Sequence, residues 1–190
     1  MEAFLVSTGI VALAEIGDKT QLLALVLAAR FRRPWPIVWG VLVATLLNHA
    51  LAGALGQLIS LYLDERVLQG LVALSFLAVA AWTLVPDKLG EEDTARIGRY
   101  GAFMATLVAF FIAEMGDKTQ VATVVLAAQY EALFAVVLGT TLGMMLANVP
   151  VVFLGNAAAG RLPLTLIRRL AALAFLMLGI YAGWLAVMGG

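Results

Sequence analysis

The sequence predicts an all-α integral membrane protein whose six transmembrane helices form two inverted repeats of three helices each. Three observations lead to this prediction. Of the 190 residues, 63% are hydrophobic and only 13% are charged, which is too apolar for a surface that faces water. The chain contains six apolar stretches long enough to cross a bilayer, and its second half repeats its first half at a constant offset.

The six predicted spans each approach or exceed the length of about 20 helical residues that crosses a ~30 Å hydrocarbon core. The stretch that begins at Met1 lacks the positively charged start and the small-residue cleavage site of a signal peptide, so we expect it to belong to the first span. The segments between the spans are short, and we expect none of them to fold alone. The spans run over Ala3 to Ala29, Ile37 to Leu61, Val67 to Val85, Gly101 to Ala128, Ala132 to Ala157 and Leu170 to Met188.

The segments between the spans predict how the protein is oriented. The first, third and fifth segments hold nine basic residues, whereas the segments on the other side hold only Arg66. The positive-inside rule therefore predicts a multi-pass protein of the inner (plasma) membrane, with the odd-numbered loops in the cytoplasm and both termini outside. Contact with anionic lipids is an alternative role for the nine residues. They are Arg30, Arg32, Arg33, Lys88, Arg96, Arg99, Arg161, Arg168 and Arg169.

The charge balance and the missing cysteines exclude several classes of function. The formal net charge is zero, so we expect no nucleic-acid partner. The chain has no cysteine, which excludes disulfides and thiolate metal ligands and leaves oxygen atoms and one histidine for metal chemistry. We expect no prosthetic group, and the sequence leaves open whether the protein forms a homo-oligomer.

The internal repeat has an offset of 99 residues. The segment Glu15 to Gln21, EIGDKTQ, returns as Glu114 to Gln120, EMGDKTQ, and the register continues through the glycine pairs Gly40/Gly139 and Gly56/Gly155. We expect residues 1–86 and 101–190 to form two three-helix repeats joined by a charged cytoplasmic linker, 87–100. Because three is odd, the second repeat enters the membrane from the opposite side. Such inverted repeats are typical of transporters, whose sites lie near the midplane where the repeats meet.

Each copy of the motif places three charged residues inside a hydrophobic span. Insertion of an Asp or Lys at a helix centre costs about 2.5 to 3.5 kcal/mol, so the six residues together cost on the order of 15 kcal/mol before pairing. A cost of that size indicates function. Asp18 and Lys19 follow Glu15 by three and four residues, so we expect all three to lie on one helical face, as do their counterparts. The six residues are Glu15, Asp18, Lys19, Glu114, Asp117 and Lys118.

The ionised motif matches one divalent cation, because four carboxylates and two ammonium groups leave a charge of −4 + 2 = −2. Carboxylate oxygens are hard ligands that suit Ca²⁺, Mg²⁺ or Mn²⁺. Gly17 and Gly116 weaken the helix locally, so a break that frees carbonyl oxygens is a hypothesis. The alternative without function is an intrahelical salt bridge from Glu15 to Lys19 and from Glu114 to Lys118, which leaves both aspartates without partners.

Further polar residues inside the spans are candidates for supporting roles. The four that follow the motif acids could complete the metal's shell or hydrogen-bond the carboxylates. His49 aligns with Asn148 at the repeat offset; a lone membrane histidine is more often a hydrogen-bonded donor than a ligand, but as a ligand it would favour Mn²⁺ over Ca²⁺. The candidates are Thr20, Gln21, Thr119, Gln120, Asn48, His49 and Asn148.

The paired Glu-x-Gly-Asp-Lys-Thr motifs, on the first and fourth of six predicted helices, resemble those of the Gdt1/TMEM165/MneA family, also called UPF0016. The resemblance covers essentially the whole chain. It implies a cation/proton exchanger for Mn²⁺ and, in eukaryotic relatives, Ca²⁺, in which Glu15, Asp18, Glu114 and Asp117 form the cation site. The short chain is similar to the bacterial members, which export manganese across the inner membrane.

The predicted function is therefore Mn²⁺ export by alternating access, with the four carboxylates releasing the metal outside and taking up protons in its place. Desolvation and mutual repulsion disfavour the anions of an empty site, so protonation makes the return step tolerable. The alternatives are a Ca²⁺/H⁺ exchanger, an exporter of basic amino acids, and a membrane scaffold that carries nothing. We expect no enzyme, because one histidine and no recognisable nucleophile leave little catalytic equipment.

Overall fold

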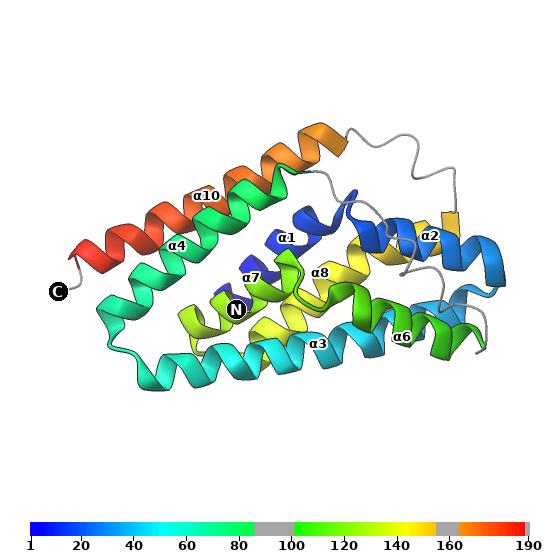
Figure 1. Ribbon diagram of the computed structural model, residues 1–190, viewed down its shortest axis with the longest axis horizontal. Helices are drawn as coiled ribbons and strands as arrows, with labels where there is room; N and C mark the ends of the chain where they lie inside the picture. Colours follow the sequence, from blue (N-terminus) through cyan, green and yellow to red (C-terminus); the bar gives the residue numbers. More distant parts are fainter. Residues whose placement is uncertain (86–100, 155–163, 189–190) are drawn as a thin grey trace.

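The computed structural model describes residues 1–85, 101–154 and 164–188 of the chain. Within these ranges every regular element is an α-helix (Figure 1). The predicted linker 87–100, the repeat glycine Gly155 and Arg161 lie outside the described residues. The helices are α1 (Glu2–Glu15), α2 (Lys19–Phe31), α3 (Pro34–Tyr62), α4 (Glu65–Thr83), α6 (Ala102–Glu114), α7 (Lys118–Tyr130), α8 (Leu133–Leu154) and α10 (Leu164–Met188).

Four of the predicted spans correspond to single long helices. The apolar segments of α3, α4, α8 and α10 (the last over Thr165–Met188) are each long and apolar enough to cross a membrane. The predicted boundaries differ most at α10, which begins at Leu164 and not at Leu170. Arg168 and Arg169 thus belong to its first turns and not to a loop. Long basic side chains fit there because their charged ends can reach outward from a helix end.

The first and fourth predicted spans are not continuous helices, so the sequence-based expectation that Glu15, Asp18 and Lys19 share one helical face is wrong. The first span divides into α1 and α2, and the fourth into α6 and α7 (Figure 1). The divisions fall inside the two motifs, at Gly17 (φ 82°) and Gly116 (φ 73°). Both glycines adopt the left-handed conformation that other residues rarely take. The hypothesis of a helix break at these glycines is confirmed.

The two halves of the chain are interleaved. Helix α1 packs along α8, and α3 packs along both α6 and α7, so helices of the first half lie against helices of the second. Helices α4 and α10 pair with each other along one side of the bundle (Figure 1). The four short helices meet in the middle of this arrangement, and the motifs therefore come together inside the bundle.

Small residues make these close contacts possible. A Cβ on Gly40 of α3 would lie 2.7 Å from Cβ of Thr106 on α6. A Cβ on Gly143 of α8 would lie 2.6 Å from the Thr8 carbonyl oxygen on α1. Gly53, Gly56, Gly139 and Gly143 likewise allow close helix packing, because a side chain at each would meet atoms of a neighbouring helix.

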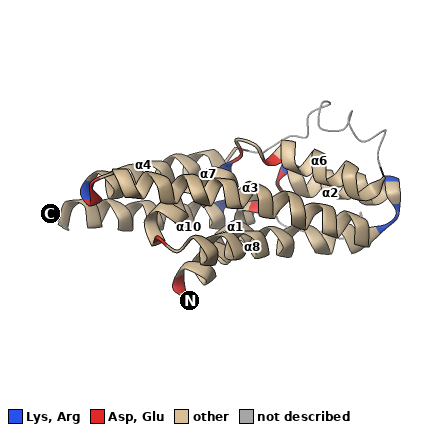
Figure 2. Cartoon of the chain, turned by 90° about the horizontal axis from the view of Figure 1, so that it is seen from below, with Lys and Arg blue, Asp and Glu red and all other residues tan. Residues whose placement is uncertain are grey.

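The outer surface of the bundle is apolar. Large hydrophobic side chains are exposed along the long helices, among them Leu51, Leu74, Leu138 and Leu173. Charged residues gather at the two ends and in one group near the middle (Figure 2). An apolar belt between polar ends is the surface that a bilayer requires. The described part of the chain is therefore that of an all-α membrane protein.

Candidate metal site at the paired helix breaks

Each helix break has the same local structure, which follows from its glycine and its glutamine. At Gly17 the backbone N–H donates to Oε1 of Gln21 (2.9 Å), and at Gly116 the N–H donates to Oε1 of Gln120 (2.6 Å). Each bond closes the turn that links one short helix to the next. The two glutamines, expected to support the site, thus hold its backbone. Neither glutamine forms a described hydrogen bond with a carboxylate of the motifs.

The break places the motif glutamates and aspartates at helix ends. Glu15 and Glu114 are the last residues of α1 and α6, and Asp18 and Asp117 are the N-caps of α2 and α7. A helix C-terminus carries partial negative charge and carbonyl groups without intrahelical partners. A carboxylate at that position adds to the negative potential, so both glutamates favour a bound cation.

Both glutamates are completely buried, and each has a described hydrogen bond to only one of its two carboxylate oxygens. Thr20 donates to Oε2 of Glu15 (2.7 Å), and Thr119 donates to Oε2 of Glu114 (3.1 Å). The predicted contact of these threonines with the carboxylates is present in the structure. Oε1 of Glu15 and Oε1 of Glu114 are buried and have no hydrogen-bond partner among the described residues. A buried carboxylate oxygen without a partner is costly, which indicates that something else binds there.

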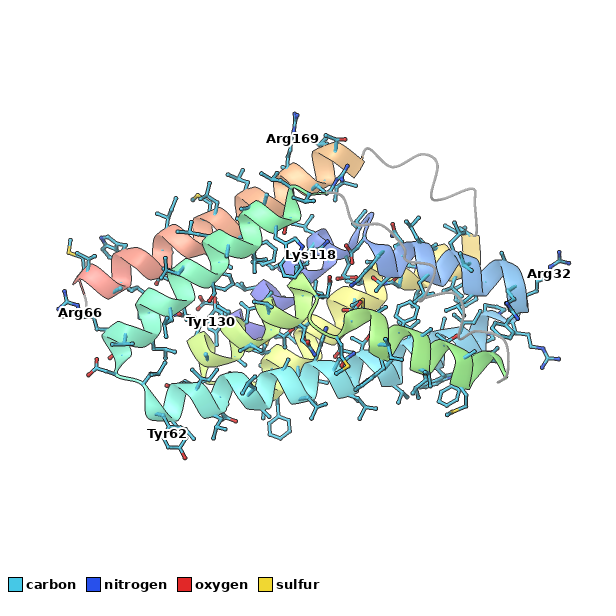
Figure 3. The ribbon with its side chains drawn as sticks, viewed as in Figure 1. Arg32, Tyr62, Arg66, Lys118, Tyr130 and Arg169 are labelled. Carbon is cyan, nitrogen blue, oxygen red and sulfur yellow. The ribbon has the colours of Figure 1, made fainter. Side chains whose placement is uncertain are left out.

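The two lysines pair across the repeats and not within them. Lys118 forms an ion pair with Asp18, and Lys19 lies 3.4 Å from Oδ1 of Asp117. Lys118 lies deep in the bundle, midway between the ends marked by Arg32 and Arg66 (Figure 3). The alternative of intrahelical pairs from Glu15 to Lys19 and from Glu114 to Lys118 is therefore wrong. Its physical basis fails because the break removes the helical spacing on which it depends.

Three of the four predicted metal ligands form one group. Glu15, Glu114 and Asp117 each offer a carboxylate oxygen, and these oxygens all lie within 4.8 Å of one another. All three residues are buried, at most 2% exposed. Asp18 is equally buried but lies outside this group and pairs with Lys118. Three hard oxygen donors at this spacing could surround one divalent cation.

The asparagines and the histidine lie beside the breaks but outside the carboxylate group. Asn48 donates to the Phe111 carbonyl (3.0 Å), one turn before Glu114. Asn148 donates to the carbonyl and the thioether of Met144 within its own helix. His49 is fully buried, and neither of its ring nitrogens has a hydrogen-bond partner among the described residues. The expectation of a hydrogen-bonded histidine is thus not met, and His49 is not a member of the carboxylate group.

Sequence reasoning missed one contact of the first break and one buried polar residue of α3. Gln21 donates to the Ala147 carbonyl of α8 (3.0 Å), which ties the first break to the second half of the chain. Thr45, one turn before His49, is buried and its hydroxyl has no described partner. Every residue has a backbone carbonyl, so the sequence cannot show which carbonyl accepts a bond from Gln21. Thr45 could have been predicted as one more hydroxyl on the polar face of an apolar span.

An α-helical membrane protein with buried carboxylates gathered at two paired helix breaks has the construction of an ion transporter. Comparison with known proteins agrees with that class. The sequence model of the GDT1 family, described as divalent cation/proton antiporters, matches residues 3–91 and 102–189 of this chain. The chain therefore belongs to the GDT1 family of divalent cation/proton antiporters, as the two motifs predict.

Curated relatives share nearly the whole length of the chain. A protein of Vibrio cholerae named "Putative manganese exporter" is 51% identical over 181 residues, which are 95% of this chain and 90% of that protein. The GDT1-like protein sll0615 of Synechocystis is 26% identical over 97% of this chain and 98% of its own length. The GDT1-like protein 4 of rice is 27% identical over 92% of this chain and 70% of its own. No solved structure matches the chain.

Proposed function

We propose that the protein exports Mn²⁺ across the inner membrane in exchange for protons, through the motif acids Glu15, Asp18, Glu114 and Asp117. One observation supports this most directly: in a buried group of three carboxylates, Glu15 and Glu114 each have a buried oxygen without a hydrogen-bond partner among the described residues. A charged group that is buried without a counter-charge is expensive unless a cation completes it. The net charge of −2 of the six motif residues equals the charge that one divalent cation neutralises.

Manganese is favoured over calcium by the comparison with known proteins, because the relative with 51% identity is named for manganese export. The three carboxylates lie within 4.8 Å of one another and suit either ion, since both Mn²⁺ and Ca²⁺ bind hard oxygen ligands. Calcium and magnesium are therefore comparison ions in the test and not the proposed cargo.

Proton exchange follows from the same charges. When the metal leaves, a site of charge −2 remains inside the bundle, away from water. Two protons taken up by the carboxylates would neutralise it, since −2 + 2 = 0, and the empty protein could then return without a buried net charge. Thr20 and Thr119 would hold the glutamates in place in both states through their hydrogen bonds.

Alternating access is the proposed mechanism, with residues 1–86 and 101–190 as two inverted repeats around the site. The helix contacts support this mechanism. At the repeat offset α1 corresponds to α6 and α3 to α8, and the packing of α1 on α8 is matched by the packing of α6 on α3, as expected of two equivalent units that interleave. The proposed orientation has both termini outside. In agreement with it, both termini lie in the same half of the molecule as the turn between α3 and α4 (Figure 1).

Export of basic amino acids fits the site less well. The motif aspartates, which would have to bind a substrate ammonium group, already pair with Lys118 and Lys19. A substrate lysine would have to displace one of these tethered ammonium groups. The group formed by Glu15, Glu114 and Asp117 has a size suited to a single ion.

The test is metal flux into liposomes that contain only this protein, with Mn²⁺, Ca²⁺ and Mg²⁺ compared in the presence and absence of a pH gradient. We expect gradient-driven Mn²⁺ movement that falls to background in Glu15→Gln, Glu114→Gln, Asp18→Asn and Asp117→Asn. The matched control is Glu65→Gln, which removes an exposed carboxylate at the start of α4 and should leave flux unchanged. Absence of flux for all three ions with folded protein would overturn the proposal.

A further inference from the structure

The two halves of the site are equivalent in sequence but not in structure. Lys118 and Asp18 form a pair whose side chains are 3% and 0% exposed. In the equivalent pair, Lys19 and Asp117 stand 3.4 Å apart and the lysine side chain is 21% exposed. Since the residue types are the same, the difference reflects the conformation of the protein and not the chemistry of the pairs.

The aspartates differ in the same way. Asp117 belongs to the group of three carboxylates with Glu15 and Glu114, and its Oδ2 lies 3.5 Å from the Thr119 hydroxyl. Asp18 is not in that group, although its glutamate neighbour Glu15 is. The aspartate with the closely held lysine is therefore the one that is absent from the cation group.

The helix breaks themselves are unequal as well. At the second break Met115 is 60% exposed and Gly116 is exposed, whereas Ile16 and Gly17 at the first break are half-buried. The ion pairs, the carboxylate group and the exposure of the breaks thus agree on one asymmetric state of a repeated motif. In transporters built from inverted repeats, the two repeats exchange their conformations when the site changes its access from one side to the other.

We propose that the four motif acids never bind the metal together, because each lysine in turn withholds the aspartate of the opposite repeat. In the conformation described here, which we take as the favoured one, Lys118 withholds Asp18 and the metal binds to Glu15, Glu114 and Asp117. In the opposite conformation Lys19 withholds Asp117, and Asp18 joins the two glutamates. The lysines are positioning residues, and this inference rests on the proposed function.

The alternation between the two Lys–Asp ion pairs has a physical rationale. Breaking a buried ion pair on its own leaves a charge without a partner and is costly. Both aspartates are ion-paired in the conformation described here. If one pair tightens as the other loosens, each aspartate keeps its lysine nearby and the cost is largely cancelled. The metal is then passed between two three-carboxylate sites that share both glutamates, so it never has to leave a complete cage of four acids.

Two charge-neutral double variants separate this proposal from a site in which all four acids act alike. Asp18→Asn with Lys118→Met removes the withheld pair, and Asp117→Asn with Lys19→Met removes the equivalent pair of the other repeat. Each leaves three carboxylates and one ammonium group, so the net charge stays −3 + 1 = −2. Methionine replaces the lysine stem with an unbranched apolar side chain. The readouts are Mn²⁺ binding to detergent-purified protein by electron paramagnetic resonance, and Mn²⁺ flux in liposomes.

We expect the first double variant to bind Mn²⁺ with an affinity within about threefold of that of the wild type. The second should bind Mn²⁺ at least about tenfold more weakly than the wild type. Both should lose proton-driven flux, because each lacks a ligand in one of the two conformations. Equal affinities of the two variants, or weaker binding by the first, would overturn the proposal. If a variant does not fold, the corresponding pairs of alanines make the same comparison. A wild-type protein that binds no Mn²⁺ would overturn the proposed function itself.

Discussion

Gly139 of α8 lies directly against Phe4 of α1, since a Cβ on Gly139 would stand 2.6 Å from the Phe4 carbonyl oxygen. The same contact occurs once more in the molecule, where a Cβ on Gly40 would stand 2.9 Å from the Phe103 carbonyl oxygen. The two pairs are related by the repeat offset, because 40 + 99 = 139 and 4 + 99 = 103. The repeat visible in the sequence therefore extends to the packing of one half against the other.

Gly139→Ala should destabilise the protein by about 1 to 3 kcal/mol, because the added methyl group overpacks a contact with backbone that cannot move aside cheaply. The measurement is unfolding of the detergent-purified protein by heat or denaturant. Gly9→Ala is the matched control. Gly9 lies in α1, and a Cβ added to it would meet no atom of the described residues within 4 Å, so this variant should gain about 0.5 to 1 kcal/mol of stability. Equal stability of the two variants would contradict the close contact.

Gly116→Val should reduce Mn²⁺ flux strongly, whereas Gly116→Asn should retain most of it. At φ 73° the backbone of Gly116 is left-handed, which costs other residues about 1 to 2 kcal/mol, and asparagine tolerates that conformation better than a β-branched residue. No described residue lies within 4 Å of a Cβ at this position, so a loss of flux would report backbone conformation and not steric overlap. Valine and asparagine variants of equal activity would show that the break does not need this conformation.

The acidic motif could be identified from the sequence alone, but the geometry of the site could not be predicted. Charged residues inside apolar spans and their repetition identified the acids, since buried charges are too costly to occur without a role. The helix break was harder to predict, because Gly9, Gly40 and Gly53 lie within unbroken helices. A glycine permits a left-handed turn, and only the surrounding structure requires one.

The pairing of Lys118 with Asp18 could not be predicted from sequence for a different reason. These residues are 100 positions apart, and their contact depends on how the two halves interleave. Local spacing suggested pairs within each motif, a rule that applies only to a continuous helix. That the nitrogens of His49 have no hydrogen-bond partner among the described residues is likewise a property of the packing. A sequence shows that a histidine is in a span but not which groups face it.

Thr20→Val should weaken Mn²⁺ binding about tenfold, whereas Thr20→Ser should bind nearly as the wild type does. The Thr20 hydroxyl donates to Glu15 at 2.7 Å in a buried setting, and hydrogen bonds to charged groups contribute about 1.5 to 3 kcal/mol. Valine keeps the shape of the side chain and removes the donor, and serine keeps the donor. Binding is measured by Mn²⁺ titration of purified protein; a serine variant as weak as valine would show that the methyl group, not the hydroxyl, is required.

Gln21→Leu should destabilise the protein more than Gln120→Leu, by about 1 kcal/mol or more. Both glutamines accept a bond from the glycine of their own break, but Gln21 also donates to the Ala147 carbonyl on α8. Its loss leaves a buried carbonyl without that partner, whereas the loss of Gln120 removes one described bond. Unfolding of the two variants under the same conditions gives the comparison, and a larger loss for Gln120→Leu would contradict it.

A single cysteine at Tyr62 should react with a membrane-impermeant maleimide in intact spheroplasts, and a single cysteine at Arg33 only after the membrane is made permeable. The chain contains no cysteine of its own, so Tyr62→Cys and Arg33→Cys each carry one reactive thiol. Tyr62 is 81% exposed at the end of α3, and Arg33 precedes the start of the same helix. Arg32 beside it and Tyr62 lie at opposite ends of the molecule (Figure 3). The reverse pattern of labelling would place the arginine-rich turn outside, against the positive-inside rule. It would also invert the two faces of the site, so that the direction of metal movement would have to be derived anew.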